Sequence, residues 1–432
     1  MGEFAKGQRI RTASGGELEV VDKLGAGGQG TVYRVSYNGK QLALKWYHPG
    51  TLRDPGVFYE NLKKNIRMGP PTAAFLWPLE VTEQTEGSFG YLMELRPKEY
   101  KDFSQFMLAR VHFSGIGALI NAALNIVNGF RVLHNRGQSY QDLNNGNFFV
   151  NPDDGEVLIC DNDNVAPYGE NLGIAGKCGY MAPEVVTGKK RPDIHTDRFS
   201  LAVVLYLLLF MDHPLMGKAT MRPCMTEELE RKVYGTSPLF VYDPNIDANR
   251  PVRGVHMNEI NLWPIYPQFV RQTFQKAFSQ ECMIGADIEH RVIEKEWQEM
   301  FTKLRDVTVT CSCGDETFIH PDHAADSCVN CGRQVVRPMI LNVKRYRVAL
   351  VSGKKLYACH VRSDSDDFRE AMGEVVASKS DPNVLGLKNL SGNPWQILLP
   401  NGTARDLLPG AVGKLARGIK IKFGNANIAE VV

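Results

Sequence analysis

The sequence predicts an α+β protein of several domains, because three kinds of pattern follow one another along its 432 residues. Short runs that alternate apolar and polar residues reach to about residue 95 and indicate antiparallel strands. Apolar residues at helical spacing dominate from about 104 to 305. A short cysteine-rich segment then leads into residues 338–432, which return to strands and turns.

The first region, residues 1–95, is predicted to form a small sheet with one helix. Its strand candidates are ELEVVDKL, GTVYRVSY, QLALKWY and YLMEL. The helix lies between the last two of these. Asp54 suits its N-cap, Pro55 suits its first turn, and VFYENLKKNI continues with helical spacing.

The second region, residues 96–305, is predicted to be mainly helical. IGALINAALNIVNGFRVLHNRG has an apolar stripe and ends in a glycine. The longest apolar run, Phe199 to Met211, is too short to cross a bilayer and suits a buried core helix. IEHRVIEKEWQEMFTKL is expected to be the amphipathic helix that ends the region.

Charge and composition argue against several classes of partner. The formal net charge of +2 gives no attraction to nucleic acid or to a membrane surface. The N-terminal stretch MGEFAKGQRI lacks the apolar run of a signal peptide. We therefore expect a cytoplasmic protein.

Two features of the first region suit a nucleotide. LGAGGQGTVY holds a G-x-G-x-x-G pattern in Gly25, Gly27 and Gly30, and glycines let backbone N–H groups approach phosphate oxygens. A strand follows the pattern, which disfavours a Rossmann site, and a purely structural turn is the alternative. Lys45 closes the apolar strand QLALK and can reach phosphates from there, unless it faces solvent.

A third feature is the polar stretch YQDLNNGNFFV, Tyr140 to Val150. Its Asp, Asn and Gly residues favour a tight loop before a buried strand. Asp142 and Asn147 stand five apart, and the next strand, VLIC, leads directly to Asp161. An acid, an amide and a strand-end acid are the groups that base catalysis and Mg²⁺ ligation require. The motif MAPE, Met181 to Glu184, follows.

In this order, the glycine-rich loop, strand lysine, D-x-x-x-x-N, strand-end aspartate and A-P-E resemble the protein kinase family over about residues 15–305. The resemblance implies a bilobal fold, with an N-lobe over 1–95 and a C-lobe over 96–305. Arg291, in RVIEKEW, strengthens it. In this family such an arginine pairs with the A-P-E glutamate, here Glu184, in a structural role.

The resemblance also implies how ATP binds. The three glycines would cover the phosphates, and Lys45 would hold the α and β phosphates. Glu60, on the following helix, would be the ion-pair partner of Lys45, unless it is a solvated helix acid. Met93 is expected to be the gatekeeper, with Glu94 and Leu95 offering backbone groups to adenine.

The resemblance assigns the chemistry to two loops: the polar loop that holds Asp142 and Asn147, and the metal loop that begins at Asp161. Asp142 is expected to orient and deprotonate the substrate hydroxyl, and Asn147 and Asp161 to hold Mg²⁺ or Mn²⁺. The implied reaction is phosphoryl transfer from ATP to a serine or threonine of a protein substrate. A nucleotide-binding pseudokinase scaffold is the alternative. The A-P-E segment with downstream Arg291 disfavours a kinase of small molecules.

The chain departs from the family pattern beside Asp142. Gln141 stands where the family has an arginine that pairs with a phosphate on the activation loop. The corresponding segment here, residues 161–184, contains no serine or threonine. These two absences agree with each other. We predict an activity that needs no Ser/Thr phosphorylation of this segment, with Tyr168 and Tyr180 as alternative targets.

Two further departures concern the metal loop and the phosphate. The family's D-F-G motif reads Asp161-Asn162-Asp163 here, so its apolar switch residue, the phenylalanine, and its glycine are lost. Asp163 either adds a carboxylate near the metals or faces solvent. Asn144 stands where such kinases keep a lysine, and Lys177 where they keep a threonine beside it. We expect Lys177 to supply the missing cation over the transferring phosphate, unless it points into solvent.

Four of the nine cysteines form two close pairs within residues 306–337. Without a secretory signal, such pairs favour a metal over disulfides, and four thiolates close a tetrahedral, structural Zn²⁺ site. We expect a zinc ribbon, with His320 or His323 in place of one cysteine, or a redox role, as alternatives. The expected ligands are Cys311, Cys313, Cys328 and Cys331.

Residues 338–432 are predicted to form a small β-sandwich. Its stretch NLSGNPWQILLPNGTARDLLPGAVGKLARGIKIKFGN resembles forkhead-associated (FHA) domains, which bind phosphothreonine. Lys379 and Ser380 are the nearest candidates for the phosphate-binding pair. A sandwich that docks partners without a phosphate is the alternative.

The succession of kinase, zinc ribbon and FHA-like domain resembles bacterial eukaryotic-type kinases. GPPTAAFLWPLEV, Gly69 to Val81, is similar to those that accompany tellurite-resistance proteins with von Willebrand A domains and a PP2C-type phosphatase. The resemblance implies these two proteins as partners.

Overall fold

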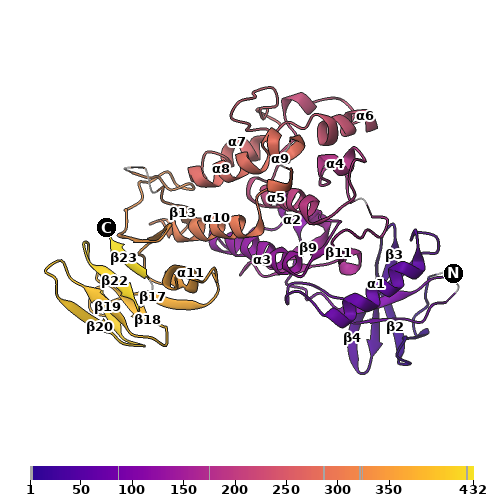
Figure 1. Cartoon of the computed structure of the whole chain (residues 1–432), viewed down its shortest axis with the longest axis horizontal. Helices are drawn as coiled ribbons and strands as arrows, with labels where there is room; N and C mark the ends of the chain where they lie inside the picture. The colour runs from indigo at the N-terminus through magenta and orange to yellow at the C-terminus, as the bar shows by residue number, and fades with distance from the viewer. Residues whose placement is uncertain are drawn as a thin grey trace. The chain divides into compact units, whose positions relative to one another are not determined.

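The computed structural model of the chain describes residues 3–85, 87–174, 176–285, 288–320, 323, 325–424 and 427–432. It confirms the predicted α+β class (Figure 1). The chain divides into two compact units. The first comprises Met1–Ser114, Asn121–Trp263 and Thr273–Lys295; the second comprises Gly115–Ile120, Pro264–Gln272 and Glu296–Val432.

The first unit opens with a six-stranded antiparallel sheet. The buried residues of β2 and β3 alternate along each strand, as expected for a sheet with one covered face. Lys45 pairs with Val32 on one side and Tyr91 on the other, which places it in a central strand. The strand order is β1 (Arg9–Arg11), β2 (Glu17–Ala26), β3 (Gly30–Tyr37), β4 (Lys40–Tyr47), β6 (Gly90–Glu94) and β5 (Glu80–Val81).

Helix α1 (Pro55–Met68) begins where the sequence predicts. The Asp54 side chain accepts a hydrogen bond from Val57 N at 3.0 Å, and Pro55 occupies the first turn. The helix ends at Gly69, whose φ of 72° favours glycine. Its apolar face packs on the sheet beside β4 (Figure 1) through Phe58, Tyr59 and Leu62.

Two small sheets frame the polar stretch. One has the order β10 (Val157–Ile159), β9 (Phe148–Val150), β7 (Lys101–Asp102), and the other pairs β11 (Ala166–Pro167) with β8 (Gln138–Ser139). The loop of Asp142 therefore runs from β8 to β9, and Asp161 follows β10 closely. Both loops are held at the same side of these short strands by antiparallel pairing of β9 with β10.

Helices are the main regular structure between residues 103 and 306. The apolar run predicted as a core helix is α5 (Ile194–Phe210), which is buried along nearly its whole length. Within the described ranges, α3 (Ile116–Asn135) alone is long and apolar enough to cross a membrane, and 61% of its most apolar window is buried inside the protein. The others are α2 (Phe103–Met107), α4 (Pro183–Val186), α6 (Glu227–Arg231), α7 (Met257–Leu262), α8 (Gln268–Ala277), α9 (Gln280–Ile284) and α10 (Glu294–Asp306).

The second unit contains the cysteine-rich segment and two antiparallel sheets. The segment starts with the hairpin of β12 (Thr308–Thr310) and β13 (Glu316–Phe318). The first sheet has the order β15 (Tyr346–Ala349), β14 (Ile340–Val343), β23 (Asn427–Val431), β22 (Lys420–Phe423), β19 (Trp395–Leu398), β20 (Ala404–Leu407). The second sheet has the order β16 (Lys355–Tyr357), β17 (Ala371–Ala377), β18 (Leu385–Asn389), β21 (Val412–Lys414).

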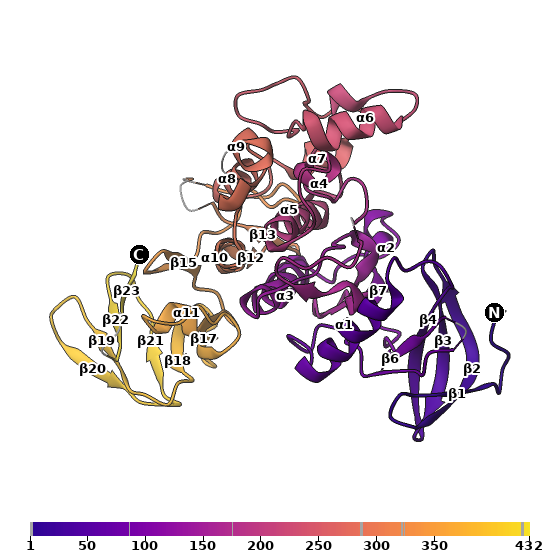
Figure 2. The same cartoon turned by 45° about the vertical axis from the view of Figure 1, so that its right-hand side comes forward.

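One apolar core joins these two sheets. Leu341 and Trp395 of the first sheet belong to the same buried cluster as Val375 and Leu387 of the second. Figure 2 shows β17, β18 and β21 beside β19, β22 and β23, with the short helix α11 (Ala358–Val361) next to β17. The end of the chain is thus a two-layer antiparallel structure, as the alternating pattern predicts.

Candidate active site

The amide side chains of the polar stretch fold its loop around Asp142. Asn144 Oδ1 accepts from Gly146 N at 3.0 Å, and its Nδ2 donates to the backbone oxygen and to Oδ1 of Asp142 at 3.1 and 3.2 Å. Asn147 Nδ2 donates to the same backbone oxygen at 2.8 Å. Short polar side chains are needed here because they supply the hydrogen bonds that a helix or a paired strand would otherwise give to the backbone of this buried turn.

Asp142 has the electrostatics of a base that works near neutral pH. Burial raises its pKa to about 6, the charge of Asp161 adds to the rise, and the hydrogen bond from Asn144 opposes it. The carboxylate is therefore still ionised at pH 7. An acid poised in this way can accept a proton from a hydroxyl.

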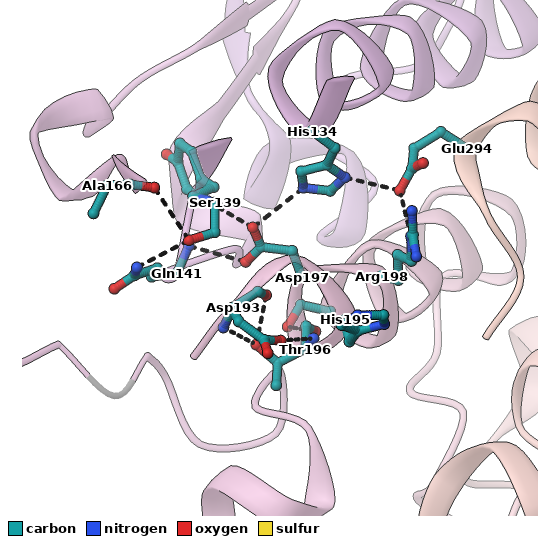
Figure 3. Close-up of polar contacts among 12 residues, drawn as sticks. His134, Ser139, Gln141, Ala166, Asp193, His195, Thr196, Asp197, Arg198 and Glu294 are labelled. Carbon is teal, nitrogen blue, oxygen red and sulfur yellow. Dashed lines mark hydrogen bonds and ion pairs between the residues drawn. The ribbon is translucent and has the colours of Figure 1, made fainter. Parts of the chain in front are cut away.

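Asp197, in the first turn of α5, fixes the backbone of this loop (Figure 3). Its carboxylate oxygens accept from Tyr140 N at 2.6 Å and from Gln141 N at 2.9 Å. Gln141 has a φ of 70°, a strained value for a residue with a side chain. The two hydrogen bonds that Asp197 accepts hold the loop in that conformation.

A buried charge cluster stands behind Asp197. His134 lies 3.2 Å from Asp197 Oδ2 and 2.8 Å from Glu294 Oε1, and Arg198 Nε also donates to Glu294 at 3.0 Å (Figure 3). Although burial alone would lower it, these two carboxylates raise the pKa of His134 to about 9. His134 is therefore charged at neutral pH, and the cluster anchors α3 to α5.

Gln141, at the position of the family's arginine, makes hydrogen bonds with neutral groups. Its Nε2 donates to Ser139 Oγ at 2.9 Å and to Glu170 O at 2.6 Å, and its Oε1 accepts from Asn171 Nδ2 at 2.7 Å. The segment after the metal loop is thus tied to the Asp142 loop without a phosphate. Of the two tyrosines considered as targets, Tyr180 is buried and Tyr168 is 55% exposed.

Lys45 lies between two carboxylates. Its side chain is 8% exposed, and its Nζ is 3.1 Å from Asp161 Oδ1 and 2.8 Å from Asp163 Oδ2. Burial alone would lower the pKa of Lys45, but Asp163 and Asp161 together raise it above its ordinary value. The ammonium group is permanently charged.

The expected ion pair between Glu60 and Lys45 is absent from the part of the chain that the structure describes. Glu60 lies on the outer face of α1, its side chain is 58% exposed, and it accepts from Lys63. The buried face of α1 carries Asn61 and Asn65 instead, and both donate to Val165 O at 2.8 Å. Glu60 as the partner of Lys45 is therefore wrong, and the alternative of a solvated helix acid is confirmed; Asn61, the next residue, faces inward because neighbouring helix residues point about 100° apart.

Asp163 supplies the second carboxylate at Lys45. It is fully buried, and its Oδ2 accepts from Lys45 and from the Tyr47 hydroxyl. The alternative that Asp163 faces solvent is therefore wrong. Asn162 is also buried, and its Nδ2 donates to Leu76 O and Ile159 O at 2.8 Å each, so backbone carbonyls satisfy its amide nitrogen, while its Oδ1 has no hydrogen-bond partner among the described residues.

The three glycines of the glycine-rich loop have two different roles. Gly25 and Gly27 have open space where a Cβ would stand, as a phosphate-covering loop requires. Gly30 is structural, because a Cβ there would lie 2.4 Å from Trp46 O of the neighbouring strand. Met93 is the last buried residue of β6, Glu94 is exposed, and Leu95 is half-buried.

Lys177 approaches the same loop but not Asp142 itself. Its Nζ lies 3.4 Å from Asn145 Oδ1, and 5.5 Å from the ring centroid of Tyr180. The side chain is exposed. The role of Lys177 at a bound phosphate stays a prediction.

Glu184 and Arg291 form the predicted structural pair. Arg291 Nη1 and Nη2 donate to the two carboxylate oxygens of Glu184 at 2.8 Å each, and Arg291 is 2% exposed. A bidentate, buried pair of this kind fixes α4 to the segment before α10.

The four paired cysteines meet as a metal site requires. Cys311 Sγ is 3.8 Å from Cys331 Sγ, and Cys313 Sγ is 3.7 Å from Cys328 Sγ. A tetrahedral Zn²⁺ with Zn–S bonds of about 2.3 Å needs sulfurs about 3.8 Å apart. The cluster could therefore hold zinc without a histidine.

Sequence reasoning did not assign several residues that build this site. Asn61 and Asn65 have a signal: two amides four apart interrupt the apolar face of a helix. Asp197 has one too, since it is an acid in the first turn of a helix that is otherwise apolar. His134 has no local signal, because its partners lie far away in the sequence.

Comparisons with known proteins agree with this geometry. Residues 18–233, half of the chain, match the protein kinase domain family. Over 90 residues the chain is 37% identical to the probable serine/threonine-protein kinase CCRP1 of Zea mays. That alignment covers 20% of this chain and 14% of the maize protein, so the chain spans a small part of that relative's length. The extent of the family match shows that this chain belongs to the protein kinase domain family.

Proposed function

We propose that the chain transfers the γ-phosphoryl group of ATP to a serine or threonine of a protein substrate. The observation that carries the proposal is the convergence of Lys45, Asp161, Asp142 and Asn147. Lys45 is paired with Asp161 at 3.1 Å, and Asn147 bonds Asp142 O. The backbone N–H of Cys160 also donates to Asn147 O at 2.9 Å, which ties the two loops together.

Asp161 and Asn147 would hold the metal. The Asp161 side chain is 43% exposed, so its carboxylate is accessible, and the amide nitrogen of Asn147 is committed to the Asp142 loop, which leaves the amide oxygen as the ligand-type atom. Carboxylate and amide oxygens suit Mg²⁺, with Mn²⁺ as a substitute. The bound metal would neutralise charge on the phosphates.

The other roles follow from position and charge. Lys45 orients the α and β phosphates with its fixed ammonium group. Asp142 orients the substrate hydroxyl and accepts its proton. Lys177 is proposed to reach the transferring phosphate from the Asn145 side of the loop. Catalysis would then be mostly positioning and charge neutralisation.

The neutral contacts of Gln141 support a kinase that is not controlled by Ser/Thr phosphorylation of residues 161–184. Its hydrogen bonds with Glu170 and Asn171 do the structural work that a phosphate would do elsewhere. A phosphate in that segment would find an amide rather than a cation at position 141.

A nucleotide-binding scaffold is the second candidate function. One observation favours it: Lys177 lies against Asn145, and Asn144, beside Asp142, carries no charge. In that case nucleotide would bind without turnover, and the second unit would act by docking partners.

The second unit is proposed to add a structural Zn²⁺ site in a ribbon over residues 306–337 and an FHA-like sandwich over residues 338–432. The sandwich would recruit the substrate or a regulator. The resemblance to bacterial kinases points to a von Willebrand A protein and a PP2C-type phosphatase in the cytoplasm.

Radiolabelled γ-phosphate transfer tests the proposal. The parent and the Asp142→Asn variant are incubated with Mg²⁺ or Mn²⁺ and a generic protein acceptor, and nucleotide binding is measured in parallel. Transfer that disappears in the variant while ATP binding stays supports the kinase. ATP binding without transfer in both proteins, across a panel of acceptors, favours the scaffold.

A further inference from the structure

Three metal-binding side chains gather in the loop between the two cysteine pairs. The ligand atoms of His320, His323 and Asp326 all lie within 4.8 Å of one another. His320 Nδ1 is 2.7 Å from Asp326 Oδ1, and His323 Nδ1 is 3.6 Å from the same oxygen. The two imidazole rings are stacked, with centroids 4.5 Å apart and planes 17° apart, and both turn Nδ1 toward the same carboxylate oxygen.

The carboxylate at the centre of this group is incompletely satisfied. The Asp326 side chain is 3% exposed, and its Oδ2 has no hydrogen-bond partner among the residues that the structure describes. A buried carboxylate oxygen without a partner is costly. Both imidazoles face Oδ1, so a cation beside them would remove that cost if Asp326 binds it through both carboxylate oxygens.

The backbone oxygens of the three residues themselves accept hydrogen bonds. Val335 N donates to Asp326 O at 2.8 Å, and Cys328 N donates to Arg333 O at 2.8 Å in the same turn. Arg337 donates to the backbone oxygens of His320, at 3.1 Å, and of His323. These contacts support the described positions of the three ligands from outside the site, as supporting hydrogen bonds do in metal sites.

The four thiols leave no need for these histidines. The sulfur separations of 3.7 and 3.8 Å already complete a four-coordinate site. Two imidazole nitrogens and one carboxylate oxygen form a different kind of set, one that suits Zn²⁺ and related divalent transition metals. Because only three protein ligands are present in the described loop, such a site keeps a coordination position for water or for a group from another molecule.

We propose that His320, His323 and Asp326 form a second metal site, for a divalent transition metal such as Zn²⁺, which loads independently of the four cysteines. The exposed side, where His323 lies, is the entry path, since that side chain is 58% exposed. The site does not depend on the kinase activity proposed above. It makes the second unit a two-metal segment, with one closed site and one exchangeable site.

Metal content of the full chain tests the proposal. The protein is loaded with Zn²⁺, dialysed and analysed by elemental mass spectrometry. The parent is expected to hold two equivalents, and His323→Gln and His320→Asn are expected to hold one. His112→Gln is the matched control, because His112 is exposed and lies outside the loop; it is expected to keep both equivalents.

Cobalt(II) spectra separate the two sites without relying on stoichiometry alone. The thiolate-to-metal charge-transfer band of the cysteine site is expected to stay in His323→Gln, while the additional visible absorption of the second site disappears. The retained band also shows that the segment still folds in the variant. A parent that binds a single equivalent, or two equivalents that both survive His323→Gln and His320→Asn, overturns the proposal and leaves His320 and Asp326 as a plain hydrogen-bonded pair.

Discussion

Replacing Asp163 is expected to damage both stability and catalysis. In Asp163→Ala, Lys45 keeps only Asp161, at 3.1 Å on a side chain that is 43% exposed, and the Tyr47 hydroxyl loses its acceptor. Removing one member of a buried ion pair costs about 3–5 kcal/mol of unfolding free energy, because the other charge stays buried. The remaining contact with Asp161 places the expected loss near the lower end, at about 3 kcal/mol.

The same change is expected to lower kcat/KM for ATP by roughly 100-fold, because the lysine remains present but is no longer held at one position. Equilibrium urea unfolding measures the first effect, and the initial rate of phosphoryl transfer at varied ATP measures the second. Asp163→Asn, which keeps the shape and removes the charge, should fall between the parent and Asp163→Ala in both measurements.

Glu60→Gln is the matched control. Glu60 is the acid that sequence spacing offers to Lys45, yet it is exposed and bonds Lys63. Its substitution is expected to change the unfolding free energy by no more than about 0.5 kcal/mol and to leave the rate unchanged. If Glu60→Gln lowers the rate as far as Asp163→Asn does, the assignment of Asp163 as the partner of Lys45 is wrong.

Four further predictions concern other parts of the molecule. Since the pKa of Asp142 is about 6, kcat/KM should fall roughly fivefold from pH 6 to pH 5, in a pH–rate profile, and a flat profile would contradict its role as base. Lys177→Ala should reduce kcat much more than it raises the dissociation constant for ATP; unchanged kcat would refute its role. Cys311→Ser should abolish Zn²⁺ binding by the thiols and lower the unfolding temperature of the second unit, measured by calorimetry with and without a chelator; equal zinc content would contradict the four-cysteine site. The pKa of His134 is raised from 6.5 to about 9, so its contribution to stability is complete below pH 6.5 and disappears as pH rises through 9; urea unfolding at pH 7 and pH 10 should show a larger loss in the parent than in His134→Gln.

The parts of the site that the sequence predicts well are those whose chemistry depends on one residue type at a fixed place along a strand or loop. Lys45 lies in a central strand because QLALK is apolar on both sides of the sheet. Asp142 and Asn147 share a loop because Asp, Asn and Gly favour a turn before the strand that follows. The cysteine pairs meet because each pair already lies in a tight turn.

The sequence could not decide the partner of Lys45, because the choice depends on how the helix and the metal loop pack. Glu60 and Asn61 are adjacent in the sequence, and only the rotation of α1 against the sheet determines which one faces inward. Asp163 could face the metals or the solvent until its burial beside Tyr47 was known. Tertiary packing therefore overrides the residue type that local spacing favours.

The surroundings of Gln141 illustrate a second reason. A glutamine can accept and donate, so its role depends on which neighbours arrive, and those neighbours come from about thirty residues away. The same holds for Asp197, whose acceptors receive backbone N–H groups from more than fifty residues earlier. Such contacts carry no short-range pattern.

The anchoring of Asn162 has a consequence for inhibitors. Compounds that enter a kinase by displacing the residue after the metal-binding aspartate need that residue to leave an apolar pocket at little cost. Here the residue is an amide with hydrogen bonds to Leu76 O and Ile159 O, and its neighbour Asp163 is paired with Lys45. Displacing the loop would break those bonds and leave the buried Lys45 without Asp163. Selective compounds for this enzyme should therefore be sought among those that bind without moving the loop.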